Sequence, residues 1–284
     1  MSSRGRGYRS VLVAVVGLAS SLAAVTLLIF VAPAGSQTQS SDAAAEIDLS
    51  RYRPTFHESF SELSISGERG SQARWFAHTP WNGDFGDAKF VDPGQGGPFV
   101  KLPRGMRITA SKGSDGIWRS GLISSRDHDG YGGSGFAQTY GYFEIKARLP
   151  DGDGVWPAFW LIGVDKSGAA SEIDVIEYYG RFPEYYHATT HIWGKGGDRS
   201  ENTLIRVPRH SLTTGYNTFG VSIEPDFTTF FLNRRPVHSE KTPREYNQPF
   251  YLLANLALGG GWPISNLHGN QSMDIEYINA YQRK

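Results

Sequence analysis

Residues 142–149 read Tyr142-Phe143-Glu144-Ile145-Lys146-Ala147-Arg148-Leu149. Apolar and charged side chains alternate from Phe143 onward, so one face of an extended chain would be apolar and the other charged. A period of two predicts a β-strand with one buried face. The next residues, Asp151-Gly152-Asp153-Gly154, have the composition of a tight turn.

The same alternation of strand and turn continues through the chain after about residue 46. Residues 219–223 alternate before a turn at residues 224–226, and residues 229–232 resume the strand. Residues 250–258 form a nearly continuous apolar run, which indicates a strand covered on both faces. Because no long amphipathic helix interrupts these strands, we predict an all-β fold, a sandwich of two antiparallel sheets in a single domain.

Composition narrows the class of protein. The chain has 284 residues, with 28 Lys and Arg against 28 Asp and Glu. This balance gives no net field that would attract a polyanion, so we expect no nucleic-acid partner. Cysteine is absent, which excludes disulfides and thiolate metal sites. A domain of roughly 240 residues buries enough surface to be stable by packing alone.

The first 50 residues differ from the rest. Arg4, Arg6 and Arg9 precede an uncharged apolar run at residues 11–34, which is typical of an export signal. The run is also long enough to cross a bilayer as an uncleaved anchor. Both interpretations place the folded domain outside the inner membrane, either periplasmic, extracellular or tethered to its outer side. The chain is thus divided into a signal peptide or membrane anchor (1–35), a flexible linker (36–50) and the folded domain (51–284).

Three carboxylates lie close together in residues 171–179, which read Ser171-Glu172-Ile173-Asp174-Val175-Ile176-Glu177-Tyr178-Tyr179. Alternation places Glu172 and Asp174 on one face of a strand, but a regular strand would turn Glu177 to the other face. Burying Glu177 in the opposite layer would cost much desolvation energy. We therefore predict one extra residue near Val175 or Ile176, a β-bulge that returns Glu177 to the side of the other two acids.

Paired carboxylates can hydrolyse a glycosidic bond. Retaining hydrolysis requires two carboxyl groups about 5–5.5 Å apart, one attacking the anomeric carbon and the other donating and later accepting a proton. Asp174 would share a hydrogen bond with Glu172, and its charge would raise the pKa of the acid. The spacing alone leaves two other interpretations open: an exposed acidic strand face and a calcium site.

Aromatic and polar residues near the acids favour a sugar-binding cleft. Trp156 and Trp160 share a face of an extended chain, where their rings could stack on sugars or pack in the core. His191 is a candidate partner of the acid/base or of a sugar hydroxyl, with a structural role as the alternative. The other candidate substrate contacts are Trp193, beside His191, Asn255, whose amide needs partners within an apolar run, and Trp262, which follows three glycines.

The segment Glu172–Glu177 resembles the bulged Glu-x-Asp-x-x-Glu signature of glycoside hydrolase family 16, which includes laminarinases, other β-glucanases, agarases and carrageenases. Further segments resemble the family in the same order along the chain. They are residues 140–144, 149–150 and 156–160 upstream, and the residues around Asn255 and 273–281 downstream. The resemblance covers residues 55–284.

This resemblance implies a concanavalin-like jelly roll with a substrate cleft on its concave face. It also implies that Glu172 is the nucleophile, Asp174 its helper and Glu177 the general acid/base. No cofactor is required for the reaction. Many members hold a structural calcium through an aspartate in the last strand, but the matching residue here is Glu276, with Glu58 nearby, so the resemblance leaves calcium open.

The implied function is that of a retaining endo-β-glycosidase that acts by double displacement on a polysaccharide. The substrate would be a β-1,3- or β-1,3-1,4-glucan or a bacterial exopolysaccharide. Residues 79–87 lack the Gly-Asn-x-Glu pattern of laminarinases, and Ile192 separates His191 from Trp193, so the polysaccharide stays open. The alternatives are a transglycosylase with the same site and a non-catalytic carbohydrate-binding protein, which would have no need for three crowded carboxylates.

Overall fold

The computed structural model describes residues 45–284 except for residues 82, 128, 131 and 195–196. The chain divides into two units, residues 1–41 and 42–284, and the predicted signal peptide or anchor lies outside the described residues. No helix in the described part of the chain is long and apolar enough to cross a membrane. The helical elements of this part are short: η1 (Leu49–Arg51), α1 (Ser211–Thr214) and η2 (Arg244–Tyr246).

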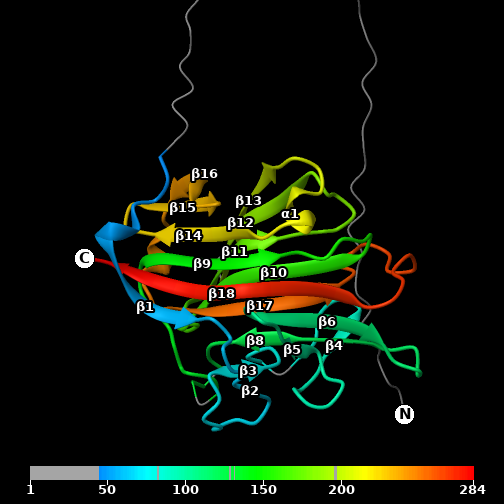
Figure 1. Cartoon of the computed structure of the whole chain (residues 1–284). Helices are drawn as coiled ribbons and strands as arrows, with labels where there is room; N and C mark the ends of the chain where they lie inside the picture. The colour runs from blue at the N-terminus through cyan, green and yellow to red at the C-terminus, as the bar shows by residue number, and fades with distance from the viewer. Residues whose placement is uncertain (1–44, 82, 128, 131, 195–196) are drawn as a thin grey trace, which may run out of the picture. The chain divides into compact units, whose positions relative to one another are not determined.

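Ten of the described strands form one sheet, which Figure 1 shows with the long strand β18 in red. Its order is β16-β15-β14-β9-β18-β6-β7-β4, with β1 beside β18 and β5 beside β6. The strands are β1 (Tyr52–Glu58), β4 (Ala88–Phe90), β5 (Phe99–Lys101), β6 (Met106–Lys112), β7 (Trp118–Ser120), β9 (Gly141–Arg148), β14 (Asn217–Ile223), β15 (Phe227–Leu232), β16 (Arg235–Lys241) and β18 (Gln271–Arg283).

The other eight described strands form a second sheet in the order β13-β12-β11-β10-β17-β8-β3-β2. They are β2 (Ile65–Ser66), β3 (Trp75–Ala77), β8 (Leu122–Ser124), β10 (Val155–Gly163), β11 (Ala169–Glu177), β12 (Tyr185–Gly194), β13 (Arg199–Arg206) and β17 (Phe250–Leu258). The predicted all-β sandwich is therefore confirmed. The prediction of purely antiparallel sheets is wrong in two places, because β2 pairs with β3 and β4 with β7 in parallel.

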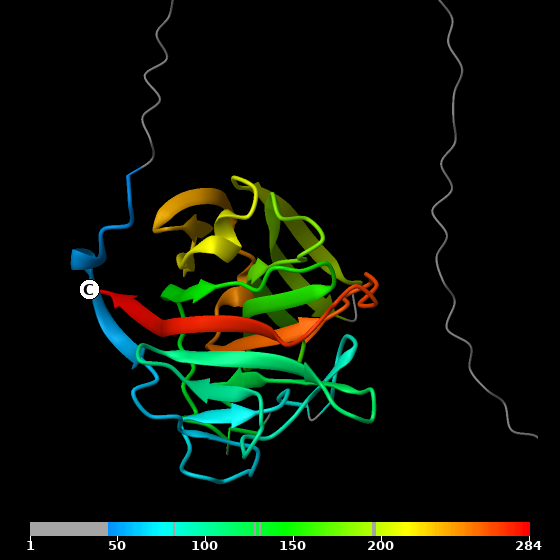
Figure 2. The ribbon, with the colours of Figure 1, turned by 45° about the vertical axis from the view of Figure 1, so that its right-hand side comes forward.

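The two sheets enclose one main core (Figure 2). Phe143 and Ile145 of β9 and Ile278 of β18 belong to the same buried cluster as Phe159 and Ile173 of the eight-stranded sheet. The prediction of a strand with one buried face at residues 142–149 is thus confirmed, because the apolar face of β9 packs in the core. Every residue of β17 is buried because apolar side chains cover both of its faces, as the continuous apolar run predicted.

The predicted linker is described only from residue 45, and there it is held against the domain. The backbone N–H of Ile47 donates to the carbonyl oxygen of Arg234 at 2.9 Å, and Lys284 N–H donates to Arg51 at 2.9 Å. The carboxylate of Glu46 forms an ion pair with Arg235 at 3.3 Å. The chain thus contacts the folded domain a few residues before the predicted boundary at residue 51.

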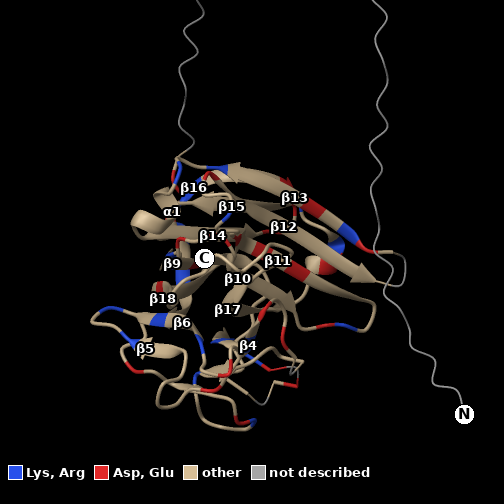
Figure 3. Ribbon diagram, turned by 90° about the vertical axis from the view of Figure 1, so that its right-hand side faces the viewer, with Lys and Arg blue, Asp and Glu red and all other residues tan. Residues whose placement is uncertain are grey.

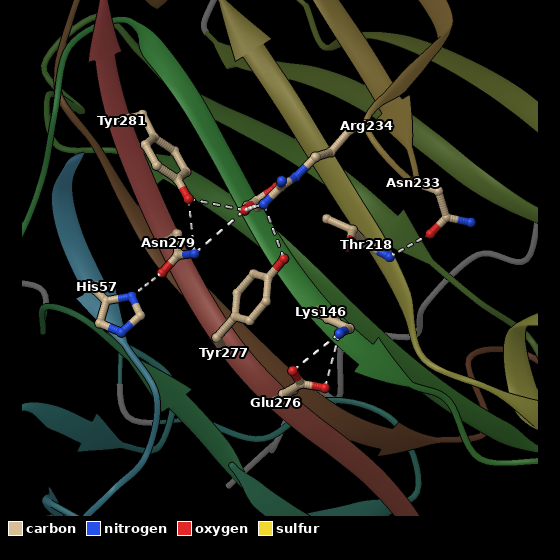
Figure 4. A network of polar contacts seen from close by, with 10 residues as sticks. His57, Lys146, Thr218, Asn233, Arg234, Glu276, Tyr277, Asn279 and Tyr281 are labelled. Atoms are coloured by element: carbon tan, nitrogen blue, oxygen red, sulfur yellow. Dashed lines mark hydrogen bonds and ion pairs between the residues drawn. The ribbon is translucent and has the colours of Figure 1, made fainter. Parts of the chain in front are cut away.

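The charged face of β9 carries a polar network on the outer side of the ten-stranded sheet (Figure 4). Arg234 binds Glu144 through two nitrogens, at 2.8 and 3.1 Å, and Tyr281 donates to the same carboxylate at 3.2 Å. The Glu144 side chain is 0% exposed. A charge so deeply buried is tolerated only when it is paired and hydrogen-bonded, so Arg234 is essential to this arrangement.

We expect Arg234→Met to destabilise the fold by about 3–5 kcal/mol, because it leaves the Glu144 carboxylate buried without a counter-charge. The measurement is urea or thermal unfolding followed by circular dichroism. Arg235→Met is the matched control, because the neighbouring Arg235 is 57% exposed and, among the described residues, forms its ion pair with the exposed Glu46. Equal losses of unfolding free energy in both variants would show that the buried ion pair stabilises the fold no more than the exposed one.

Candidate active site

The predicted bulge brings the three acids to one face of β11. Phe159 of β10 faces Ile176, but the next residue, Trp160, faces Asp174, so Val175 is an extra residue. On the other side of β11, the register with β12 shifts between Asp174 and Glu177. The prediction of an irregularity near Val175 is confirmed. Ile173, Val175 and Ile176 then face the core, which leaves the carboxylates on the opposite face.

This face contains a cavity of about 380 Å³. Acidic residues of β11 appear red near the centre of the eight-stranded sheet in Figure 3. The cavity crosses five neighbouring strands of that sheet, from β13 to β17. Its lining consists of Trp81, Phe85, Trp156, Ala158, Trp160, Glu172, Asp174, Glu177, Thr189, His191, Asn202 and Asn255.

Each carboxylate of the cluster has its own hydrogen-bond partners. Glu172 Oε2 accepts a bond from the indole N–H of Trp193 at 3.2 Å. Asp174 Oδ2 lies 3.1 Å from Nε2 of His191, whose Nδ1 lies 2.6 Å from the hydroxyl of Ser200. The expected sharing of a hydrogen bond between Asp174 and Glu172 is therefore replaced by an Asp174–His191 pair.

Glu177 Oε1 accepts two hydrogen bonds, from the indole N–H of Trp156 at 2.8 Å and from the hydroxyl of Tyr179 at 2.9 Å. The proposed partnership of His191 with the acid/base is thus wrong, because the register of β12 places His191 opposite Glu172 and its ring reaches Asp174. The protein donors of Glu177 come instead from β10 and from the residue two places along the chain.

Burial and crowding perturb the titration of the cluster. Burial, and then the charge of Asp174, raise the pKa of Glu172 to about 7. The same two causes raise the pKa of Glu177 above its ordinary value. Although burial opposes the charged form of His191, its hydrogen bond to Asp174 and the charges of the cluster raise its pKa. A site of this kind retains a proton near neutral pH, as general acid catalysis requires.

Of the predicted substrate contacts, Trp156, Trp160, His191 and Asn255 line the cavity, whereas Trp193 and Trp262 are not among its lining residues. Trp160 donates its N–H to Asn255 Oδ1 at 2.8 Å, while Asn255 Nδ2 has no partner among the described residues. Trp193 is 40% exposed and stacks on His191, with ring centroids 4.7 Å apart. Trp262 is not among the lining residues, because the glycine turn after β17 directs it to Phe182, with ring centroids 5.1 Å apart.

Several residues of the cavity were not predicted from the sequence. Trp81 lies in a loop after β3 and is 49% exposed, and its ring meets that of Trp160 at 6.1 Å. An exposed tryptophan in a glycine-containing loop is the signal that could have indicated it. Thr189 and Asn202 of β12 and β13 give no sequence signal, because only the strand register places them beside the acids.

Two groups of side chains have donor atoms that a metal ion could use. Within the described residues, one oxygen or nitrogen each of Glu172, Asp174 and His191 lie within 4.8 Å of one another, a spacing that could hold an ion. The residues matched to the structural calcium do not fit a cation. Lys146 lies 3.1 Å from Glu276 (Figure 4), and Arg74 lies 2.7 Å from Glu58, so protein cations already neutralise both carboxylates.

A jelly roll with paired carboxylates and tryptophans in an open cleft on one sheet is a carbohydrate-active domain. The chain belongs to the family described as glycosyl hydrolases family 16, whose model matches residues 104–279. Strands β1 to β5 precede this match, while β6 to β17 lie within it.

Two curated relatives come from Rhizobium meliloti (strain 1021). Endo-1,3-1,4-beta-glycanase EglC is 29% identical over 92% of this chain, and endo-1,3-1,4-beta-glycanase ExsH is 30% identical over 89%. The chain spans 58% and 57% of their respective lengths. The solved catalytic domain of an endo-1,3-beta-glucanase (laminarinase) from Thermotoga petrophila has the same fold. Its TM-score is 0.64 at 21% identity, and the match covers 84% of this chain and 100% of that one.

Proposed function

We propose that the domain is a retaining endo-β-glucanase, with Glu172 as the nucleophile and Glu177 as the general acid/base. The observation that carries this proposal is the bulge at Val175, which brings two glutamates five positions apart onto one cleft-lining face. Family membership and the similarity to the endo-1,3-1,4-beta-glycanases EglC and ExsH support a β-1,3-1,4- or β-1,3-glucan as the substrate. The separation of about 5–5.5 Å between the two carboxyl groups stays a prediction.

In the first step, a carboxylate oxygen of Glu172 attacks the anomeric carbon, and the glycosidic C–O bond breaks. The bonding electrons pass to the leaving oxygen, which takes the proton of Glu177. In the second step, water attacks the same carbon and gives its proton to Glu177, while Glu172 departs as a carboxylate. The product keeps the anomeric configuration of the substrate because the carbon is inverted twice.

The two glutamates have similar electrostatic surroundings. When His191 is protonated, its charge favours the ionised form of Glu172, which is the form that attacks. His187 acts on Glu177 in the same direction, and burial and then the charge of Asp174 raise the pKa of both glutamates. We assign the proton of the reactive state to Glu177 and the charge to Glu172, as the resemblance of residues 172–177 to the family motif implies.

The open form of the cleft supports cleavage within a chain rather than at its end. The cavity at the acids shares Trp81 with a second cavity of about 490 Å³, whose lining also includes Arg69, Phe76 and Asp127. A polysaccharide could lie across both, with several sugars on the side of Trp81. Trp81 itself offers an exposed ring for sugar stacking at this junction.

The test is an assay of purified protein against laminarin, lichenan, cellulose, agarose and bacterial exopolysaccharides. We expect a rapid fall in viscosity of a β-glucan with few new reducing ends, and NMR should detect the β-anomer first. Initial release of the α-anomer would contradict a retaining mechanism. If Glu172→Ala binds the polymer like the wild type and neither protein cleaves it, the domain is a carbohydrate-binding protein instead.

We further propose that the domain works outside the inner membrane, either released or tethered. The support is the sequence alone: three arginines precede the apolar run of residues 11–34. If the domain is tethered, protease added to spheroplasts should degrade it. If it is released, the domain should be recovered from the medium. Protection of the folded domain until the cells are lysed would contradict this proposal.

A further inference from the structure

The environment of Glu177 distinguishes its two carboxylate oxygens. Oε1 accepts hydrogen bonds from Trp156 and Tyr179, at 2.8 and 2.9 Å. Within the described part of the chain, no donor contacts Oε2, although Glu177 lines the cavity. Oε1 is therefore turned to the protein, and Oε2 is the oxygen left for a substrate.

These contacts determine where a proton can sit. An indole N–H is a donor only and has no lone pair to accept a bond, so the oxygen that it contacts must be an acceptor. A carboxyl oxygen offers two lone pairs, and the hydroxyl of Tyr179 occupies the second one on Oε1. A proton placed on Oε1 would displace one of these two donors.

We propose that Tyr179, together with Trp156, acts as a positioning residue that confines the transferable proton of Glu177 to Oε2. This inference rests on the proposed function, because it assigns the atom through which the acid/base works. The proton then passes from Oε2 to the glycosidic oxygen as the C–O bond breaks, and water returns a proton to the same atom in the second step.

The packing around Tyr179 holds its hydroxyl in place. The ring stacks on Trp156, with centroids 5.7 Å apart and planes 16° apart, and the edge of His187 meets it at 5.4 Å. Gly260 closes the other side. A Cβ atom there would lie 2.6 Å from Tyr179 and 2.7 Å from Trp156, so only glycine allows the loop to approach these rings. Trp156 and Tyr179 are therefore packed together, and the packing of one fixes the position of the other.

The groups that face Glu177 come from three strands and from Tyr179, two residues beyond the end of β11. They comprise Glu172 and Asp174 on β11, His187 and His191 on β12, Trp156 on β10, and Tyr179. Burial and Asp174 raise the pKa of Glu177, while the hydrogen bonds of Tyr179 and Trp156 and the charge of His187 act in the lowering direction. Loss of the Tyr179 donor should therefore raise this pKa further.

The test is the pH dependence of kcat/KM for Tyr179→Phe on the β-glucan that the wild type cleaves. Glu177 must be protonated to act, so activity falls as the pH rises through its pKa. We expect the alkaline limb of Tyr179→Phe to move upward by about one pH unit, because a hydrogen bond to a carboxylate is lost. The acid limb, which requires an ionised Glu172, should stay in place.

A second readout is the nature of the leaving group. A misplaced proton matters for a sugar leaving group, which needs protonation, and hardly matters for dinitrophenolate, which does not. We expect Tyr179→Phe to lose about tenfold in kcat/KM on the glucan and much less on a dinitrophenyl β-glucoside oligomer. Equal losses on both substrates would indicate a general structural defect and overturn the proposal.

Tyr178→Phe is the matched control, because the neighbouring tyrosine is buried in the core and its hydroxyl has no partner among the described residues. Its pH profile should match the wild type. An unmoved alkaline limb in Tyr179→Phe, or the same shift in both variants, would contradict the role of Tyr179. Failure of the proposed function is recognised separately, since the wild type would then cleave no β-glucan.

Discussion

Glu172→Ala should abolish hydrolysis of the β-glucan, with a loss of kcat on the order of 10⁴-fold or more. Without the nucleophile, the anomeric carbon has no carboxylate to form the covalent intermediate. The substitution also removes a half-buried charge that is crowded by Asp174, so the fold should be retained or stabilised. Reducing-sugar assays and thermal unfolding measure the two effects.

Azide or formate should partly restore the activity of Glu172→Ala on a dinitrophenyl β-glycoside. The small anion occupies the space of the missing carboxylate and attacks the anomeric carbon from the same side. Because this carbon is inverted only once, azide should yield the α-glycosyl azide. Glu201→Ala is the control, since Glu201 lies on β13 of the same sheet, exposed and outside the cavity lining. A loss of activity in this control would indicate a nonspecific effect.

The sequence predicts the fold well where strands are long enough for a pattern. The alternation in residues 142–149 and the apolar run in residues 250–258 predicted β9 and β17, and both strands are present. The parallel pairing of β2 with β3 and of β4 with β7 was not predictable, because these strands have two or three residues each. So few residues show no periodicity, and their pairing is decided by tertiary contacts.

The acids of the site were predictable because their spacing conflicts with a regular strand. Only a bulge keeps Glu177 out of the core, so desolvation alone pointed to the correct local structure. The partners of the acids were less predictable. His191 reaches Asp174 because β12 pairs with β11 in one particular register, in which Glu172 faces His191. Nothing in the local sequence specifies that register.

Trp156 illustrates a second limit. The sequence indicated an aromatic platform for a sugar, and the residue does line the cavity. Its N–H, however, donates to Glu177, and its ring packs on Tyr179. The side chain of Trp156 thus both lines the cleft and donates a hydrogen bond to the acid/base. Periodicity assigns a side chain to a face of the strand, but it does not reveal which atom it will contact there.

Glu177→Ala should behave differently from Glu172→Ala. Loss of the general acid should reduce kcat/KM on a β-glucan by roughly 10²- to 10⁴-fold, because a sugar leaving group must be protonated. On a dinitrophenyl β-glycoside the first step should survive, since that leaving group departs without a proton. The second step then lacks its base, so the covalent intermediate should accumulate. A burst of dinitrophenol followed by slow turnover, together with a mass increase on Glu172, would measure this accumulation.

Azide distinguishes the two glutamates most directly. In Glu177→Ala it needs no general base, so it should attack the accumulated intermediate from the face opposite Glu172. The anomeric carbon is then inverted twice, and the product should be the β-glycosyl azide, whereas Glu172→Ala should give the α-anomer. NMR coupling constants of the anomeric proton separate the two products. If both variants give the same anomer, or if the burst occurs in Glu172→Ala instead, the roles proposed for these residues are reversed or wrong.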